Sequence, residues 1–200
     1  LVFPTSRLHE LGYFEKYKSA YYNSFADKLF SVDSRFQFLD RNLAETDPSF
    51  KQIIPYINVV CNNEWLTARR SKKVGESRLA GLRSTGLGGH VNTTDVDGET
   101  NLEPLALFLK GLVREINEEL KFESEVIPKW ELSGFINEDD NEVGRVHFGL
   151  NYIIEVDSKD AVSIIDEGLV DHEWMNPIDL LASREEFEGW SKILIDYFYG

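Results

Sequence analysis

The 200-residue sequence predicts a mixed α/β (α+β) protein with a small N-terminal helical appendage. Apolar runs with the composition of β-strands follow one another after residue 50. Residues 102–120 carry the apolar stripe of a half-buried helix. The first fifty residues differ from the rest, because they are rich in Tyr and Phe. We therefore expect an appendage over residues 1–50 and the main domain over residues 51–200.

The N-terminal segment is expected to dock on the main domain, because its aromatic side chains are too numerous for a free tail. Apolar residues at mixed helical spacing over 8–30 predict one or two short helices. Residues 36–39 are expected to form a short strand. Asp47-Pro48 predicts a turn, since the residue before a proline is disfavoured in a helix.

In the main domain, strands and helices are predicted from the spacing of apolar residues. The Asn62-Asn63 pair predicts a turn between the first two strands. Pro104 fits a helix only in its first turn, so the long helix should begin near Leu102. The expected strands cover 52–61, 65–69, 130–136 and 145–156, and another short strand is expected to end at 174–175. The expected helices cover 102–120, 177–181 and 185–199.

The composition excludes several classes of function. Lys plus Arg is 21 and Asp plus Glu is 35, so the net charge is −14. Such an acidic protein is a poor general binder of nucleic acid or of anionic membranes. An anionic substrate would need a local basic patch or bound cations. The single cysteine, Cys61, rules out an intrachain disulfide, and no apolar stretch has the length of about 18 residues that a transmembrane helix needs. We expect a cytoplasmic protein.

Three glutamates lie together at the end of the long predicted helix. At about 100° per residue, Glu115, Glu118 and Glu119 fall within a wedge of about 100°, largely away from the apolar stripe. Like charges at this spacing repel one another. Arg114 offsets part of that repulsion, and a divalent cation would offset more, because hard cations prefer carboxylate oxygen. A solvated acidic face on a surface helix is the alternative interpretation.

The run from Arg114 to Phe122 (REINEELKF) resembles the second half of the Nudix hydrolase signature. That signature is Gly, five residues, Glu, seven residues, then Arg-Glu-apolar-any-Glu-Glu-any-Gly-apolar. The Gly-Gly-His-Val run at 88–91 is similar to the strand that enters the signature in this family, and Gly98-Glu99-Thr100 resembles a tripeptide found before its helix. Further similarity, to a bacterial subgroup of predicted phosphoesterases, covers most of residues 48–181.

The sequence departs from the signature in two places. Lys121 stands at the glycine position, so the turn after the helix is expected to differ. Fourteen residues, 100–113, separate Glu99 from Arg114, where the signature has seven. The helix or the preceding loop is therefore expected to be longer. Glu103 competes with Glu99 as the match to the first signature glutamate.

The resemblance implies a mixed sheet sandwiched between helices, with the signature forming a loop–helix–loop that binds divalent metal. Glu115, Glu118 and Glu119 would match the family's metal ligands and catalytic residues, with a backbone carbonyl near Gly89 completing the sphere. Mg²⁺ or Mn²⁺ would neutralise pyrophosphate oxygens and acidify the attacking water. The general base is left open between one of these glutamates and a later acid such as Glu173.

Basic residues before the Gly-Gly run are the candidates for phosphate binding. Arginine suits phosphate because guanidinium binds it in a bidentate way. A solvated loop is the alternative for this cluster, and a structural role is the alternative for each histidine. His147, Arg145 and Asn151 share the polar face of one predicted strand. The candidate substrate-binding residues are Arg69, Arg70, Arg78, Arg83, His90, Arg145 and His147, with Lys72 and Lys73 in the same cluster.

The function expected from these features is that of a divalent-metal-dependent hydrolase. It would cleave a phosphoanhydride bond in a nucleoside diphosphate linked to another group. A nucleotide-binding or regulatory module with weak or no catalysis is the alternative, because the signature is stretched and lacks its glycine. An isomerase is a third and weaker alternative. The expected partner is a nucleotide-type small molecule, and the appendage is expected to cover the pocket or to form a homodimer interface.

Overall fold

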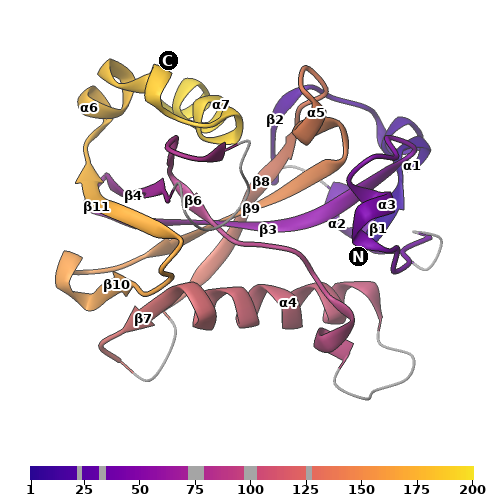
Figure 1. Cartoon of the computed structure of the whole chain (residues 1–200), viewed down its shortest axis with the longest axis horizontal. Coiled ribbons are helices and arrows are strands. Elements are labelled where there is room, and N and C mark those ends of the chain that lie inside the picture. The colour runs from indigo at the N-terminus through magenta and orange to yellow at the C-terminus, as the bar shows by residue number, and fades with distance from the viewer. Residues whose placement is uncertain (22–23, 32–34, 72–78, 97–102, 125–127) are drawn as a thin grey trace. The chain divides into compact units, whose positions relative to one another are not determined.

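The structure is a computed structural model of the chain, which describes residues 1–21, 24–31, 35–71, 79–96, 103–124 and 128–200 (Figure 1). The fold is α+β: a large mixed β-sheet is flanked by helices, which confirms the fold class predicted from the sequence. The chain divides into two compact units, each built from three stretches of sequence. None of the helices in the described ranges combines the length and the hydropathy needed to cross a lipid bilayer.

The first unit consists of residues Leu1–Tyr56, Gly88–Glu115 and Leu132–Asn151. The N-terminal segment therefore belongs to the same compact unit as two later stretches of the chain. The unit contains all or most of β1 (Val2–Pro4), α1 (Thr5–Leu11), β2 (Lys16–Ser19), α2 (Phe25–Leu29), α3 (Arg41–Ala44), β3 (Phe50–Cys61), η3 (Thr93–Val96), α4 (Pro104–Glu119), β8 (Trp130–Asn137), α5 (Glu142–Arg145) and β9 (His147–Glu155).

Strands of the N-terminal segment extend the sheet of the first unit. The hydrogen-bonded order is β3-β9-β8-β2, and β1 pairs with β3. Both added strands are antiparallel to their partners, with Val2 opposite Gln52 and Lys16 opposite Asn137. The two predicted short helices form as α1 and α2, but β2 lies between them. The strand predicted over 36–39 is reduced to a single bridge between Gln37 and Val2.

Phenylalanine rings from distant parts of the sequence form the core of the first unit. The ring centroids of Phe25 and Phe135 are 4.8 Å apart, and those of Phe3 and Phe148 are 5.5 Å apart. Phe3, Phe135 and Phe148 are fully buried. Burial of large aromatic side chains is a major source of stability. Phe3, Phe25 and Phe30 of the first fifty positions are therefore core residues, whereas Tyr13, Tyr21 and Phe38 are exposed.

The second unit consists of residues Ile57–Leu87, Ile116–Glu131 and Tyr152–Gly200. Its sheet has the order β11-β4-β3, with β5 paired to β4 and β6 paired to β3. A separate pair is formed by β7 and β10. The elements are β4 (Glu64–Arg70), β5 (Arg83–Ser84), β6 (Gly86–Leu87), β7 (Leu120–Phe122), η4 (Lys159–Ala161), β10 (Val162–Ile164), β11 (Leu169–Met175), α6 (Pro177–Ala182), η5 (Arg184–Glu186) and α7 (Gly189–Tyr199).

The predicted turn at Asn62-Asn63 is confirmed as the tip of the β3–β4 hairpin. Val60 pairs with Trp65 across the hairpin. The φ angles of Asn62 and Asn63 are 49° and 65°, so both residues occupy the left-handed region. A two-residue hairpin of this kind suits the right-handed twist of its strands, and asparagine tolerates the positive φ.

Helix α4 carries the acidic cluster. It begins at Pro104, where a missing amide hydrogen costs no helical hydrogen bond, and Leu102 lies outside the described residues. The apolar stripe is confirmed in part, because Leu112, Ile116 and Leu120 are buried. Leu105 and Val113, which the spacing also placed on it, are exposed, whereas Phe108 is buried. After Glu119 the chain enters β7 directly, and Lys121 pairs with Ser163 in β10. The position of the signature glycine is therefore part of a strand.

Two predicted elements begin later in the chain than expected. The strand predicted from Arg145 begins at His147, because Asn141 caps α5 by accepting a hydrogen bond from the amide of Gly144. Arg145 ends that helical turn and does not share a strand face with His147. The helix predicted from Glu185 begins at Gly189, where the Glu188 side chain accepts hydrogen bonds from the first backbone amides.

Candidate active site

Arg114 organises the loop that precedes α4. Its Nε donates to Asp95 Oδ1 at 2.6 Å, its Nη1 to Glu115 Oε1 at 2.8 Å and its Nη2 to the carbonyl oxygen of His90 at 2.8 Å. Asp95 and Glu115 are buried, at 6% and 7% exposure. One guanidinium therefore compensates two buried carboxylates and ties the loop to the helix, since a buried charge without a partner is costly.

The two glycines of the Gly-Gly-His-Val run are required by close backbone contacts. Gly88 has a φ of +135°, and a Cβ there would collide with the carbonyl oxygen of Pro55. This left-handed backbone also ends β6 at Leu87, so the strand expected over 88–91 is wrong. A Cβ on Gly89 would lie 2.7 Å from Glu115 Oε1. The Glu115 carboxylate therefore lies directly against the Gly89 backbone.

The three glutamates differ in environment more than the sequence suggested. Glu115 is buried, so the expectation that it lies largely away from the apolar stripe on an acidic face is wrong. The reason is that Arg114 and the Gly89 backbone cover it. Glu118 is exposed and Glu119 is partly exposed, within one helical turn of Glu115 on α4. Carboxylate oxygens are the donors that Mg²⁺ and Mn²⁺ prefer, so the chemistry of these side chains suits such an ion.

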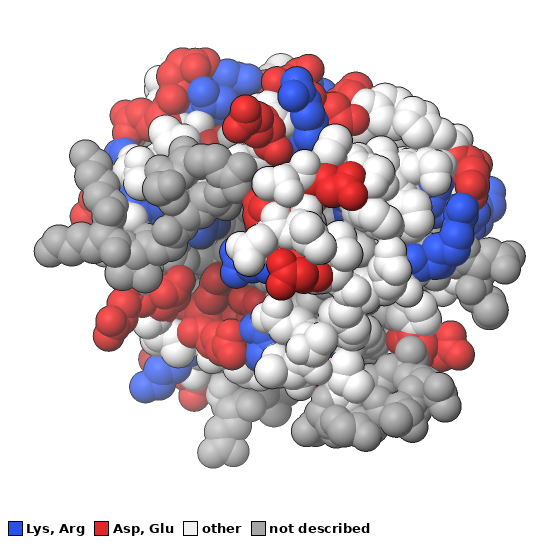
Figure 2. All heavy atoms as spheres, turned by 45° about the vertical axis from the view of Figure 1, so that its right-hand side comes forward, with Lys and Arg blue, Asp and Glu red and all other residues white. Residues whose placement is uncertain are grey.

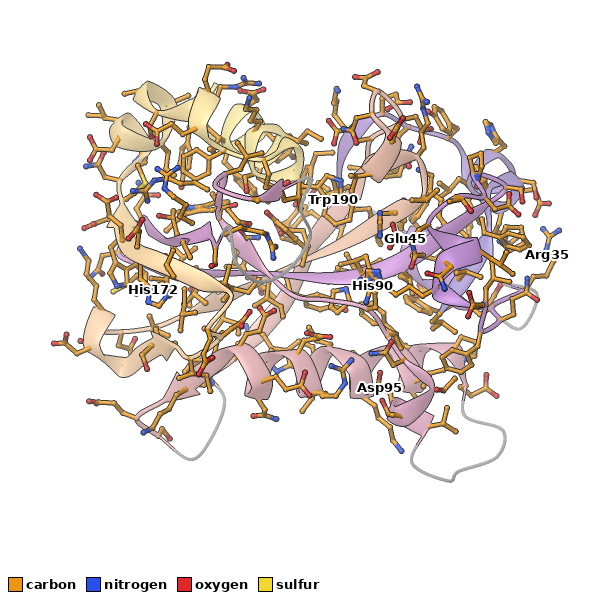
Figure 3. All side chains as sticks on the ribbon, viewed as in Figure 1. Arg35, Glu45, His90, Asp95, His172 and Trp190 are labelled. Carbon is orange, nitrogen blue, oxygen red and sulfur yellow. The ribbon has the colours of Figure 1, made fainter. Side chains whose placement is uncertain are left out.

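A second cluster in the first unit combines Glu45 with His90 and His147. The three side chains offer ligand atoms that all lie within 4.8 Å of one another. Glu45 Oε1 is 3.4 Å from His90 Nε2 and 3.6 Å from His147 Nε2. Glu45 directly follows α3, His90 lies in the loop after β6 and His147 begins β9. Figure 3 shows Glu45 and His90 side by side and Asp95 close to α4.

The hydrogen bonds around His147 define its tautomer. Nδ1 is 2.7 Å from the carbonyl oxygen of Val143, which can only accept, so Nδ1 carries the proton. The Nε2 atom of His147 is 3.2 Å from the amide nitrogen of Gln52, which also donates to Glu45 Oε1 at 3.3 Å. The lone pair of His147 Nε2 therefore faces Gln52 and Glu45.

His90 is held in its neutral form. Burial lowers the pKa of His90 from 6.5 to about 4, and the nearby Arg41 and His147 act in the same direction, while Glu45 opposes them. Its imidazole is thus uncharged near neutral pH, and a neutral imidazole is the form that coordinates metals.

Arg69 and Arg83, two of the arginines predicted to bind phosphate, lie in the second unit, where carboxylates already face them. Arg69 is 2.7 Å from Glu186, and Arg83 is 2.8 Å from Glu173. Arg70 has a buried Nε atom without a hydrogen-bond partner among the described residues. Any phosphate that binds Arg69 or Arg83 has to compete with these ion pairs.

Other predicted site residues are placed elsewhere or not described. Arg145 donates from Nε to the carbonyl oxygen of Asp139 at 3.0 Å. Glu103 is exposed just before α4. Arg78 and Glu99 lie outside the described residues, as do Lys72, Lys73, Gly98 and Thr100.

Sequence patterns did not identify Glu45, Gln52 or Asp95. Asp95 had one usable signal, because an acid shortly after the Gly-Gly run is a natural partner for Arg114. Glu45 and Gln52 had none, since they lie 45 and 95 residues from the histidines that they contact.

No protein-family model matches the chain. Individual proteins of known sequence or structure do match it. Protein YmaB of Bacillus subtilis (strain 168) is 30% identical over 174 residues, which is 86% of this chain and 82% of that protein. The crystal structure of Tm1382, a protein assigned to the Nudix hydrolases, matches with a TM-score of 0.77 and 31% identity. That match covers 99% of this chain and 96% of Tm1382.

A more distant match shows the fold alone. It is the bifunctional NMN adenylyltransferase/ADP ribose pyrophosphatase of Francisella tularensis, solved with AMP and a manganese ion. The TM-score is 0.51 and the sequence identity is 14%. The match covers 74% of this chain and 40% of that chain. The match to Tm1382, in contrast, extends over almost the full length of both chains at 31% identity. The chain therefore belongs to the Nudix hydrolase family.

Proposed function

We propose that this protein is a pyrophosphohydrolase that depends on a divalent metal. It cleaves a phosphoanhydride bond of a nucleoside diphosphate linked to another group. Membership of the Nudix hydrolases supports the reaction class. Mg²⁺ or Mn²⁺ is the proposed cofactor, and the manganese and AMP bound by the Francisella tularensis enzyme agree with this choice.

The observation that carries this proposal is the position of Glu115. Its carboxylate is buried, held by Arg114 at 2.8 Å and pressed against the backbone of Gly89. Glu118 and Glu119 follow within one turn of the same helix. In this proposal the three glutamates and the Gly89 carbonyl hold the ion. A bound dication would neutralise phosphate oxygens and lower the pKa of a coordinated water.

The residues of the chain have distinct proposed tasks. Arg114 positions Glu115 and the Gly89 loop and does not contact the substrate. Glu118 or Glu119 removes a proton from the attacking water, and Glu173 is the alternative general base. For Glu173 to act as a base, its ion pair with Arg83 at 2.8 Å has to break.

Substrate contacts are proposed for the residues that the sequence identified as candidates. Phosphate oxygens would be bound by arginine side chains, which exchange a carboxylate partner for the substrate. With no metal bound to it, His90 would contact the substrate as a neutral hydrogen-bonding group. Both ring nitrogens of His147 already have partners, in Val143 and Gln52. The proposed set remains Arg69, Arg70, Arg78, Arg83, His90, Arg145 and His147. Homodimer formation and a cytoplasmic location also stay predictions, as does a separate appendage over residues 1–50.

The test is hydrolysis of a panel of dinucleotides, nucleotide sugars and nucleoside triphosphates with Mg²⁺ or Mn²⁺. The Glu118→Gln variant should lose at least about 100-fold in kcat/KM, or ~2.7 kcal/mol of transition-state stabilisation. Glu118 is exposed, so the folded state should survive the change. Circular dichroism and thermal unfolding verify this point.

Glu123→Gln is the matched control, because it removes the same charge from an exposed position shortly after α4. It should keep activity within about twofold. Equal activity of the Glu118→Gln and wild-type proteins would remove Glu118 from the metal site. Binding of nucleotides without hydrolysis of any member of the panel would instead favour a binding module.

A further inference from the structure

The cluster of Glu45, His90 and His147 has a composition unlike that of the glutamates on α4. Two imidazole nitrogens and one carboxylate oxygen point at one another from three separate segments of the first unit. Two histidines with one carboxylate bind Zn²⁺ in catalytic zinc sites and Fe²⁺ in non-haem iron sites. Mg²⁺ in contrast binds mainly through oxygen and keeps several waters.

Two of the three distances between the ligand atoms match a tetrahedral ion. Ligand atoms bound at 2.0–2.2 Å in a tetrahedron lie about 3.4 Å from one another, whereas neighbouring ligands in an octahedral Mg²⁺ site lie about 2.9 Å apart. The measured separations from Glu45 Oε1 are 3.4 Å to His90 Nε2 and 3.6 Å to His147 Nε2. All three ligand atoms lie within 4.8 Å of one another, so binding of a tetrahedral ion would need the two imidazole nitrogens to lie no farther apart than about 3.4 Å.

The surroundings of His147 are those of a metal ligand. A histidine that coordinates a metal usually donates its other ring N–H to a carbonyl or a carboxylate, which orients the ring. His147 Nδ1 makes such a bond to the carbonyl of Val143 at 2.7 Å, and its Nε2 lone pair is directed at Glu45. Two acceptors 3.6 Å apart repel each other unless a donor or a cation bridges them. The Gln52 amide bridges them in this structure.

We propose that Glu45, His90 and His147 form a binding site for a first-row transition-metal dication, with Zn²⁺ as the preferred ion. The site is separate in its ligands from the Mg²⁺ or Mn²⁺ site proposed on α4. The side chains of Glu45 and His90 are 20% and 19% exposed, so the ion can enter from solvent. Three protein ligands leave a fourth position for water or an anionic group.

A metal at this site would link segments that are distant in sequence. Glu45 comes from the N-terminal segment, and His90 comes from the loop that Arg114 fixes to α4. A ligand that binds only the folded chain stabilises it by mass action. Zn²⁺ is therefore expected to raise the melting temperature, by ~5 °C at saturation.

The experiment is titration of the untagged chain with Zn²⁺ by calorimetry and with Co²⁺ by visible absorption. Wild-type protein should bind one Zn²⁺ per chain at this site. Co²⁺ should show the intense bands of a tetrahedral site, and excess Mg²⁺ should not remove them. Glu45→Gln and His147→Gln should each weaken Zn²⁺ binding ~100-fold. Glu118→Gln should leave the Co²⁺ spectrum unchanged.

His9→Gln is the matched control, since His9 is an exposed histidine of the same unit. It should bind Zn²⁺ as the wild type does. A wild-type chain that shows neither a tetrahedral Co²⁺ spectrum nor a rise in melting temperature would overturn the proposal. So would folded Glu45→Gln and His147→Gln variants with unchanged affinity.

Anomalous diffraction from a zinc-soaked wild-type crystal does not depend on how the variants fold. A peak bonded to His90 Nε2, His147 Nε2 and a Glu45 oxygen would support the site. Zinc found only at the glutamates of α4 would refute it.

Discussion

The ionisable groups of the two units are arranged in different ways. In the first unit, carboxylates and imidazoles converge, with Glu45 3.4 Å from His90 and Glu115 against Gly89. In the second unit, arginines and carboxylates alternate in ion pairs, such as Arg83 with Glu173 at 2.8 Å. Figure 2 shows acidic and basic side chains mixed on the face that it displays. The first arrangement suits the binding of cations. In the second, an arginine has to give up its carboxylate partner before it can bind an anion.

The largest expected difference between the units is in the stability lost when one arginine in each is replaced. Arg114→Met should destabilise the protein by about 3 kcal/mol, because buried Asp95 and Glu115 would lose their common partner. Arg184→Met should cost less than about 1 kcal/mol, since Arg184 and Asp196 form a surface ion pair. Urea unfolding measures both. Similar losses for the two variants would show that the first unit does not depend on its buried charges.

Gly89→Ala should impair the proposed metal site without lowering the stability of the fold. The new Cβ would lie 2.7 Å from Glu115 Oε1 and would push that carboxylate away. We expect an approximately 100-fold loss of kcat/KM, or ~2.7 kcal/mol, with little change in melting temperature. Gly168→Ala is the control, because its Cβ would lie 3.3 Å from the Asp166 carboxylate, a close contact that a shift of a few tenths of an ångström relieves. Full activity of Gly89→Ala would mean that Glu115 needs no fixed position.

A buried lysine links pH to the stability of the first unit. Lys51 Nζ donates to Asp139 at 2.6 Å and to the carbonyl of Gly144 at 2.8 Å. Lys51→Met should cost about 2 kcal/mol at neutral pH, because these acceptors would lose their donor. Burial lowers the pKa of Lys51 below 10.5, and Asp139 opposes this effect.

The sign of the pH effect follows from that pKa. Between the folded-state pKa and 10.5, the unfolded chain binds more protons at Lys51 than the folded chain does. Stability contributed by this residue therefore increases as the pH rises through that window. Denaturant unfolding from pH 7 to pH 10 should show this slope in the wild type and not in Lys51→Met. Lys129→Met, at a highly exposed position, should keep the wild-type slope. A slope that persists in Lys51→Met would contradict the assignment.

The smallest effects are expected from the paired arginines of the second unit. Arg83→Gln and Arg69→Gln should each reduce stability by less than about 1 kcal/mol. As phosphate ligands they should raise KM about tenfold, or ~1.4 kcal/mol, with kcat almost unchanged. Arg184→Gln is the control for loss of charge. Unchanged KM in both variants would leave these arginines with only the ion pairs seen in the structure.

Local patterns predicted much of the fold. The stripe on α4, the Asn62-Asn63 hairpin and the signature half from Arg114 to Glu119 were identified, because each depends on spacing within one or two turns. Boundaries were less accurate where a cap decided them, as Asn141 does for α5. The burial of Glu115 could not be predicted, since the loop that covers it comes from outside the helix.

The sequence alone determined that the chain contains several strands and one long amphipathic helix. It also determined that Arg114 precedes three glutamates and that the chain resembles the Nudix hydrolases. Periodicity and composition carry that information within short windows. Only the tertiary structure brought Glu45 to His90 and His147 and gave Arg69 and Arg83 their carboxylate partners. Such pairs are set by how the strands align and pack, and no short window of sequence records that.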